Sequence, residues 1–221
     1  MEAAVEVAEE SAGAGTGMSA ASFAVTATDP ARADALNSQR MLDILQRSCH
    51  ASKSEWLGLR ELRVGTGRRN GNAQRLDAFA LNCFLHLGMK RICYELKTSR
   101  ADYLAELKQP LKRRIGMRYS NEFYFVTPGG MLSISEVPAE CGLIELGVAG
   151  SAEWRRLLQR QAGFFTFDAA SREYSMITVP APWRDTPGPT WTLVAAMLRN
   201  QRREIQERPP EPRVQEELPF E

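Results

Sequence analysis

The order of helix-like and strand-like segments is the feature that most constrains how this chain can fold. Apolar residues recur near a 3.6-residue period in the first ordered segment, which predicts a helix. Three strand-like segments follow, then a segment that Ser99 caps as a helix, then an aromatic strand. These segments are, in order, residues 31–50, 56–64, 75–84, 91–97, 99–118 and 122–127. The order helix, three strands, helix, strand predicts an α/β domain.

Further elements and two polar ends surround that core. After residue 140 the patterns predict a strand, a helix, two short strands and a final helix, at residues 141–146, 151–161, 164–179 and 190–207. This part is expected to form a C-terminal α/β extension. Residues 1–30 are rich in Ala, Gly, Ser and Glu, and residues 208–221 are rich in Pro and Glu. We therefore expect one domain at residues 31–207 between a disordered N-terminal segment and a flexible tail.

Charge and hydropathy exclude several classes of protein. The formal net charge is +1, so affinity for a polyanion must come from local clusters of basic residues. No stretch of 18 apolar residues occurs, and the acidic N-terminus is unlike a signal peptide, so a soluble cytoplasmic protein is expected. Four cysteines lack paired spacing, and Cys83, His86 and Cys93 do not match a common zinc pattern. Reduced, packed thiols are the favoured interpretation.

Three charged residues on the second and third predicted strands carry the functional signal. Side chains alternate along a strand, so Glu95 and Lys97 emerge on one face while Tyr94 and Leu96 point to the other. Asp77 is a lone acid within an apolar strand segment, where Asp is disfavoured. If these two strands form a hairpin, both carboxylates can reach one site.

Such a site suits a hard divalent cation. Two carboxylates, a backbone carbonyl from Leu96 and water molecules are typical ligands of Mg²⁺, which Mn²⁺ can replace. A cation there would polarise a scissile phosphate and activate water, with Lys97 stabilising the charge that develops. The alternative is an ordinary surface hairpin whose Glu-Lys pair has no chemical role.

The surrounding sequence resembles a known family of nucleases. The segments RLDAFAL, ICYELKTSRADYLAELKQPLKRR, NEFYFVTPGGM and VPAECGLIEL are similar to the PD-(D/E)XK, or restriction-endonuclease-like, superfamily, and most similar to MmcB-like DNA-repair proteins and related phage and bacterial proteins. The resemblance spans residues 55–147. It implies an αβββαβ core with a mixed sheet and metal-dependent cleavage of DNA, in repair or phage DNA processing.

The resemblance also implies roles for individual residues. Asp77 and Glu95 would be metal ligands and Lys97 the catalytic lysine, in an endonuclease rather than an exonuclease. Leu76 stands where the family usually has Pro. A further acid often assists, and Glu55 and Glu61 are both candidates. The alternative function is a catalytically inactive nucleic-acid-binding module with the same fold.

Basic residues cluster after Lys97 and predict contact with DNA. The segment between Lys97 and Arg118 has seven basic residues against two acids. Phosphate contact is expected from Arg100, Lys108, Lys112 and Arg113, and it would make binding sensitive to salt. The alternative is a solvated helix face. The loop 68–72 (RRNGN) is a further possible contact.

The C-terminal tail contains a second motif. Its end, QEELPFE, resembles the peptide by which bacterial repair proteins bind the sliding clamp. Gln215, Leu218 and Phe220 would be the contact residues, presented on a proline-stiffened tether. A plain solvated tail is the alternative.

Overall fold

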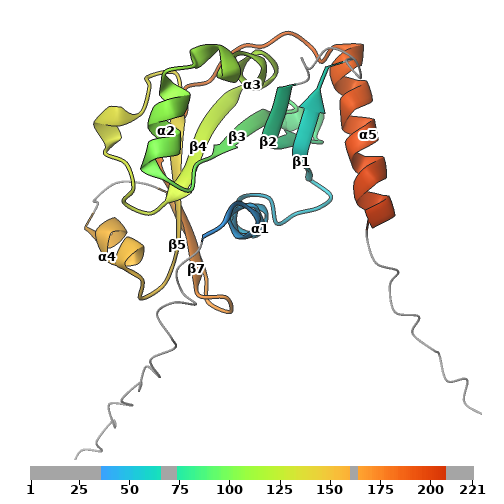
Figure 1. The fold of residues 1–221 in the computed structure, drawn as a ribbon. Helices are drawn as coiled ribbons and strands as arrows, with labels where there is room; N and C mark the ends of the chain where they lie inside the picture. Colours follow the sequence, from blue (N-terminus) through green and yellow to red (C-terminus); the bar gives the residue numbers. More distant parts are fainter. Residues whose placement is uncertain (1–35, 66–73, 160–163, 208–221) are drawn as a thin grey trace, which may run out of the picture.

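The computed structural model describes residues 36–65, 74–159 and 164–207. It confirms the predicted α/β class: one seven-stranded mixed sheet carries five α-helices within these ranges (Figure 1). The strands are β1 (Trp56–Val64), β2 (Gln74–Asn82), β3 (Arg91–Leu96), β4 (Glu122–Pro128), β5 (Gly142–Val148), β6 (Phe164–Asp168) and β7 (Glu173–Val179). The helices are α1 (Ser38–Cys49), α2 (Arg100–Leu107), α3 (Arg114–Tyr119), α4 (Ala152–Leu158) and α5 (Trp191–Glu207), and three short 3-10 helices are η2 (Leu85–Leu87), η3 (Pro110–Arg113) and η4 (Ile134–Glu136).

The sheet has the strand order β1-β2-β3-β4-β5-β7-β6. The first three strands form an antiparallel meander, and β4 and β5 continue the sheet in parallel with β3. A parallel neighbour requires a long crossover connection. The chain between β3 and β4 supplies it with α2, η3 and α3. β7 and β6 close the far side in antiparallel order.

Two hydrophobic cores lie on the two faces of this sheet. On β3, Cys93 packs into the core that includes Tyr103 of α2, Tyr119 of α3 and Leu193 of α5. Its neighbour Tyr94 packs into the other core, which α1 covers (Figure 1). Successive side chains of a strand point to opposite faces of the sheet, so neighbouring residues of β3 enter different cores. Residues that share a face with Cys93 therefore point toward α2 and α3.

Helix α1 begins at the Asn37 cap, whose side chain accepts from the Arg40 amide, and buries Met41 and Ile44 against the sheet. At its other end the buried His50 Nε2 lies 2.7 Å from the Tyr94 hydroxyl. Burial lowers the pKa of His50 to about 4, so the imidazole is neutral near pH 7. This end of the helix is thereby anchored to β3.

The predicted C-terminal elements form and enlarge the same sheet. β5, β7 and β6 add three strands, and a connection without regular structure leads from β7 back to α5. α5 packs beside β1, where Asn200 donates to the Arg60 carbonyl oxygen at 2.8 Å. In the ranges described, no helix is long and apolar enough to cross a membrane.

Candidate active site at the ends of β2 and β3

A cavity of about 470 Å³, bordered mainly by polar and charged side chains, lies where β2 and β3 approach α2. Asp77 reaches it from β2 and Glu95 from β3. Lys97, which directly follows the last residue of β3, also borders it. Asp102 and Glu106 reach it from α2. The three residues singled out by the sequence pattern therefore border one cavity.

Strand pairing brings the two carboxylates together. β2 and β3 are antiparallel with Ala78 opposite Tyr94, so Asp77 and Glu95, one step further along, face each other. Residues opposite one another in an antiparallel pair share a face of the sheet. Asp77 Oδ2 accepts a hydrogen bond from the Leu96 amide at 3.0 Å. Its Oδ1 lies 3.9 Å from Nη2 of Arg75. The hydrogen bond from the Leu96 amide fixes Asp77 against β3.

The β1–β2 hairpin is irregular beside Asp77. Glu61, across from Asp77, has a φ of +50°, which costs a residue other than Gly roughly 1–2 kcal/mol. Leu59 and Leu62, on either side of it, pack into the same core, so the alternation of faces breaks at this point. Such strained positions often occur at functional sites. Glu61 Oε1 is 3.6 Å from Arg75 Nη1. Burial raises the pKa of Asp77, and the negative charge of Glu61 acts in the same direction.

The other candidate acid lies elsewhere. Glu55 accepts a hydrogen bond from Asn82 at 3.2 Å, at the opposite end of the hairpin from Asp77. Of the two acids that the sequence left open, Glu61 is therefore the one near the cavity.

Lys97 is held among acids from two elements. Its amide donates to the Val126 carbonyl oxygen of β4 at 2.9 Å, and its Nζ lies 2.9 Å from Glu95 Oε1. Nζ is also 3.6 Å from Glu106 Oε2 and 3.8 Å from Asp102 Oδ2. Burial acts to lower the pKa of Lys97, but these carboxylates outweigh it and raise the pKa above its usual value. These neighbours therefore favour the ammonium form of Lys97.

The pKa values of the two facing acids, Asp77 and Glu95, are also raised, and for a carboxyl group this favours the neutral form. Burial, followed by the charge of Asp77, raises the pKa of Glu95 to about 7. Burial also raises the pKa of Asp77, although the Leu96 amide and Lys97 partly offset it. Two partly buried carboxylates that face each other resist ionising together. A bound cation would favour ionisation of both.

The donor set fits one hard divalent cation. The described ranges contain no group of three or more His, Cys, Asp or Glu side chains arranged to hold a metal. Mg²⁺, however, commonly takes only one or two protein carboxylates and keeps several waters. Asp77 and Glu95 supply two carboxylates beside a polar cavity, and Leu96, the third predicted ligand, also borders it. These residues can therefore hold Mg²⁺ or Mn²⁺ with water as the remaining ligands.

The four basic residues predicted to contact DNA have different surroundings. Arg100 makes a two-pronged ion pair with Glu136. Arg113 is 6% exposed, stacks over Phe125 with 5.7 Å to the ring centre, and lies 3.5 Å from Glu140. Lys108 and Lys112 are exposed, and Lys112 also borders the cavity. Lys108 and Lys112 are therefore best placed to meet a polyanion.

Other predicted contacts lie outside the described residues. These are loop 68–72 and the tail residues Gln215, Leu218 and Phe220.

The sequence pattern did not identify Asp102 and Glu106 as part of the site. Their spacing of four residues places them on one side of α2, which is the signal that would have found them.

Comparisons with protein-family models, with curated proteins and with solved structures found no match to this chain. Function is therefore inferred from its side chains and their geometry.

Proposed function

We propose that this chain is a metal-dependent deoxyribonuclease of the restriction-endonuclease-like type, which hydrolyses phosphodiester bonds of DNA in repair or phage DNA processing. The observation that carries the proposal is the joint placement of Asp77, Glu95 and Lys97 at one polar cavity. The order α1, β1–β3, α2, β4 supports it, because an antiparallel meander followed by a parallel fourth strand suits an αβββαβ core. Endonuclease action is the favoured form.

Each residue has a distinct part in the proposed reaction. Asp77 and Glu95 would hold Mg²⁺, with the Leu96 carbonyl as a further ligand. When bound, the ion supplies Lewis-acid activation of the phosphate and of water. The Lys97 ammonium, buried beside Glu95, stabilises negative charge that develops on the phosphate oxygens. Because Lys97 is charged in its resting state, proton removal from water falls to another group or to solvent.

The direct test is a cleavage panel with Mn²⁺. Single-stranded, duplex, flapped and mismatched DNA would be incubated with the full chain, with and without EDTA. We expect cleavage of at least one substrate, internal to the strand, that EDTA abolishes. DNA binding without cleavage of any substrate would instead identify a catalytically inactive binding module, the alternative with the same fold.

DNA contact through Lys108 and Lys112 predicts a change in salt dependence. Both side chains are exposed, and Lys112 borders the cavity. Each phosphate contact contributes about 0.9 to the slope of log affinity against log salt concentration on duplex DNA. Replacing both lysines by Ala should therefore reduce the slope by about 2. Fluorescence anisotropy of labelled duplex in EDTA measures it without cleavage.

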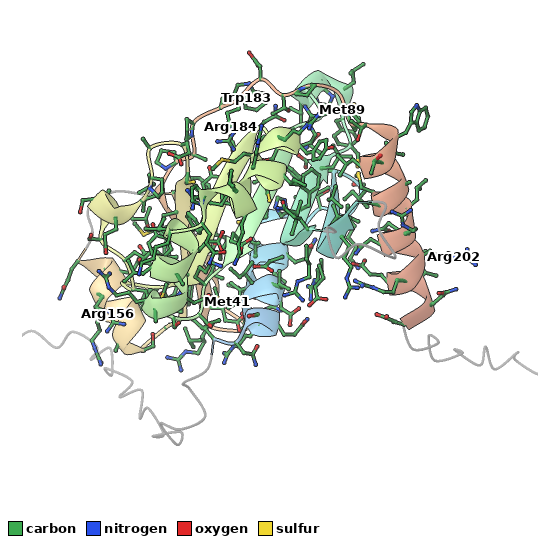
Figure 2. All side chains as sticks on the ribbon, turned by 45° about the horizontal axis from the view of Figure 1, so that its top comes forward. Met41, Met89, Arg156, Trp183, Arg184 and Arg202 are labelled. Carbon is green, nitrogen blue, oxygen red and sulfur yellow. The ribbon has the colours of Figure 1, made fainter. Side chains whose placement is uncertain are left out.

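Two arginines on α5 provide the matched control. Arg199 and Arg202 are exposed, and Figure 2 shows Arg202 projecting outward from α5, away from the body of the domain. The double Ala variant at these positions should leave the slope unchanged. Equal slope changes in both double variants would show that general charge, and not the surface beside the cavity, governs binding.

A further inference from the structure

Lys97 has more acidic neighbours than a single ammonium needs. Its Nζ makes a hydrogen bond of 2.9 Å to Glu95 and has looser contacts of 3.6 Å to Glu106 and 3.8 Å to Asp102. The side chains of Lys97 and Glu106 are 6% and 7% exposed, whereas that of Asp102 is 57% exposed. Glu106 is therefore the one buried second partner within reach of the ammonium among the described residues.

The hydrogen bond from Lys97 conflicts with cation binding by Glu95. The ammonium occupies Oε1 of Glu95, one of the lone-pair sites that a cation would use, and its positive charge repels a divalent ion. If Glu95 turns to a cation, the buried ammonium loses its nearest counter-ion. A buried charge without a partner is strongly destabilising. A second carboxylate must then accept it.

Glu106 is held in place for that task. Its helix begins at the Ser99 cap and is fixed to the segment before β5 by the Tyr103 hydroxyl, which donates to the Glu136 carbonyl oxygen at 2.7 Å. Arg113 donates to the Glu106 carbonyl oxygen at 3.5 Å. With its backbone anchored, the Glu106 carboxylate needs only a small side-chain movement to bond Lys97.

We infer that Glu106 is a positioning residue that takes over the Lys97 ammonium when Glu95 binds a divalent cation. This inference rests on the proposed metal site. It gives Lys97 two partners, Glu95 in the metal-free protein and Glu106 in the loaded one. The exchange keeps the ammonium charged and beside the phosphate position.

A double-mutant cycle tests the exchange through Mn²⁺ affinity, measured by electron paramagnetic resonance of the free ion. The four proteins are the wild type, Glu106→Gln, Lys97→Met and the double variant. Loss of the negative charge of Glu106 weakens the electrostatic attraction for Mn²⁺ whether residue 97 is Lys or Met. This contribution therefore cancels when the two pairs of proteins are compared. Where Lys97 is present, Glu106→Gln should weaken binding by about tenfold more than where Lys97 is Met.

Two further variants separate reach from charge. Glu106→Asp retains the charge but is one methylene shorter and reaches Lys97 less well. Like Glu106→Gln, it should weaken Mn²⁺ binding more where Lys97 is present than where residue 97 is Met. Because the negative charge remains, it should weaken binding little in the Met background. Asp102→Asn should show less coupling, because solvent screens that exposed acid. Thermal unfolding of each variant verifies that it is folded, and Glu106→Asp serves if Glu106→Gln does not fold.

The outcomes distinguish this inference from the proposed function. If the wild type binds no Mn²⁺, the metal site fails and the inference fails with it. If the wild type binds Mn²⁺ and both Glu106 variants weaken binding equally with and without Lys97, only the role of Glu106 is overturned.

Discussion

Replacing Lys97 by Met is expected to lower Mn²⁺-supported DNA cleavage roughly a hundredfold to a thousandfold, the range typical of losing one group that stabilises transition-state charge. Met keeps much of the apolar stem of this buried side chain and removes only its charged end. The same change should leave Mn²⁺ binding intact or tighter, because the ammonium competes for Glu95. Single-turnover cleavage rates at saturating Mn²⁺ measure the loss.

The control for this variant lies at the opposite end of the same strand. Lys90 precedes β3 and pairs with Glu122 at 2.6 Å, as Lys97 follows β3 and pairs with Glu95. Lys90→Met should change the cleavage rate by less than about twofold, since the surroundings of the cavity are untouched. Cleavage by Lys97→Met at the wild-type rate, with the fold retained, would place the catalytic charge elsewhere.

Local sequence patterns were sufficient to predict the elements that carry the site. Alternation along residues 91–97 placed Glu95 and Lys97 on one side, and β3 has that geometry, with Tyr94 on the other. The Ser99 cap predicted the start of α2, and its hydroxyl accepts from the Asp102 amide at 3.2 Å. These features depend on neighbours a few residues apart, which a sequence records directly.

Features that depend on distant contacts were beyond the sequence pattern. The left-handed backbone of Glu61 arises where two strands pair, and no local motif encodes it. The burial of Arg113 depends on Phe125 and Glu140, which belong to other segments, so a count of basic residues could not separate it from Lys112. The joining of β5, β7 and β6 to the same sheet was likewise not predicted.

Loss of either facing carboxylate is expected to remove cation binding. Asp77→Asn and Glu95→Gln preserve shape while replacing an anionic ligand by a neutral amide, which Mg²⁺ and Mn²⁺ bind poorly in comparison. Because only these two carboxylates face each other across β2 and β3 as the proposed ligands, while Asp102 and Glu106 lie beside Lys97, affinity should fall by at least about a hundredfold. Asp43→Asn, a half-exposed acid of α1 paired with Arg60, is the matched control and should bind as the wild type does.

Isothermal titration of Mn²⁺ into the wild type and these three variants tests the metal site most directly. The titration is done at about pH 8, because the Glu95 carboxyl, with its pKa of about 7, is then ionised. We predict one bound ion per chain for the wild type and Asp43→Asn, and no measurable binding for Asp77→Asn and Glu95→Gln. A wild type that binds no ion, or binding that persists in both site variants, would contradict the assignment of this cavity as the centre of a nuclease.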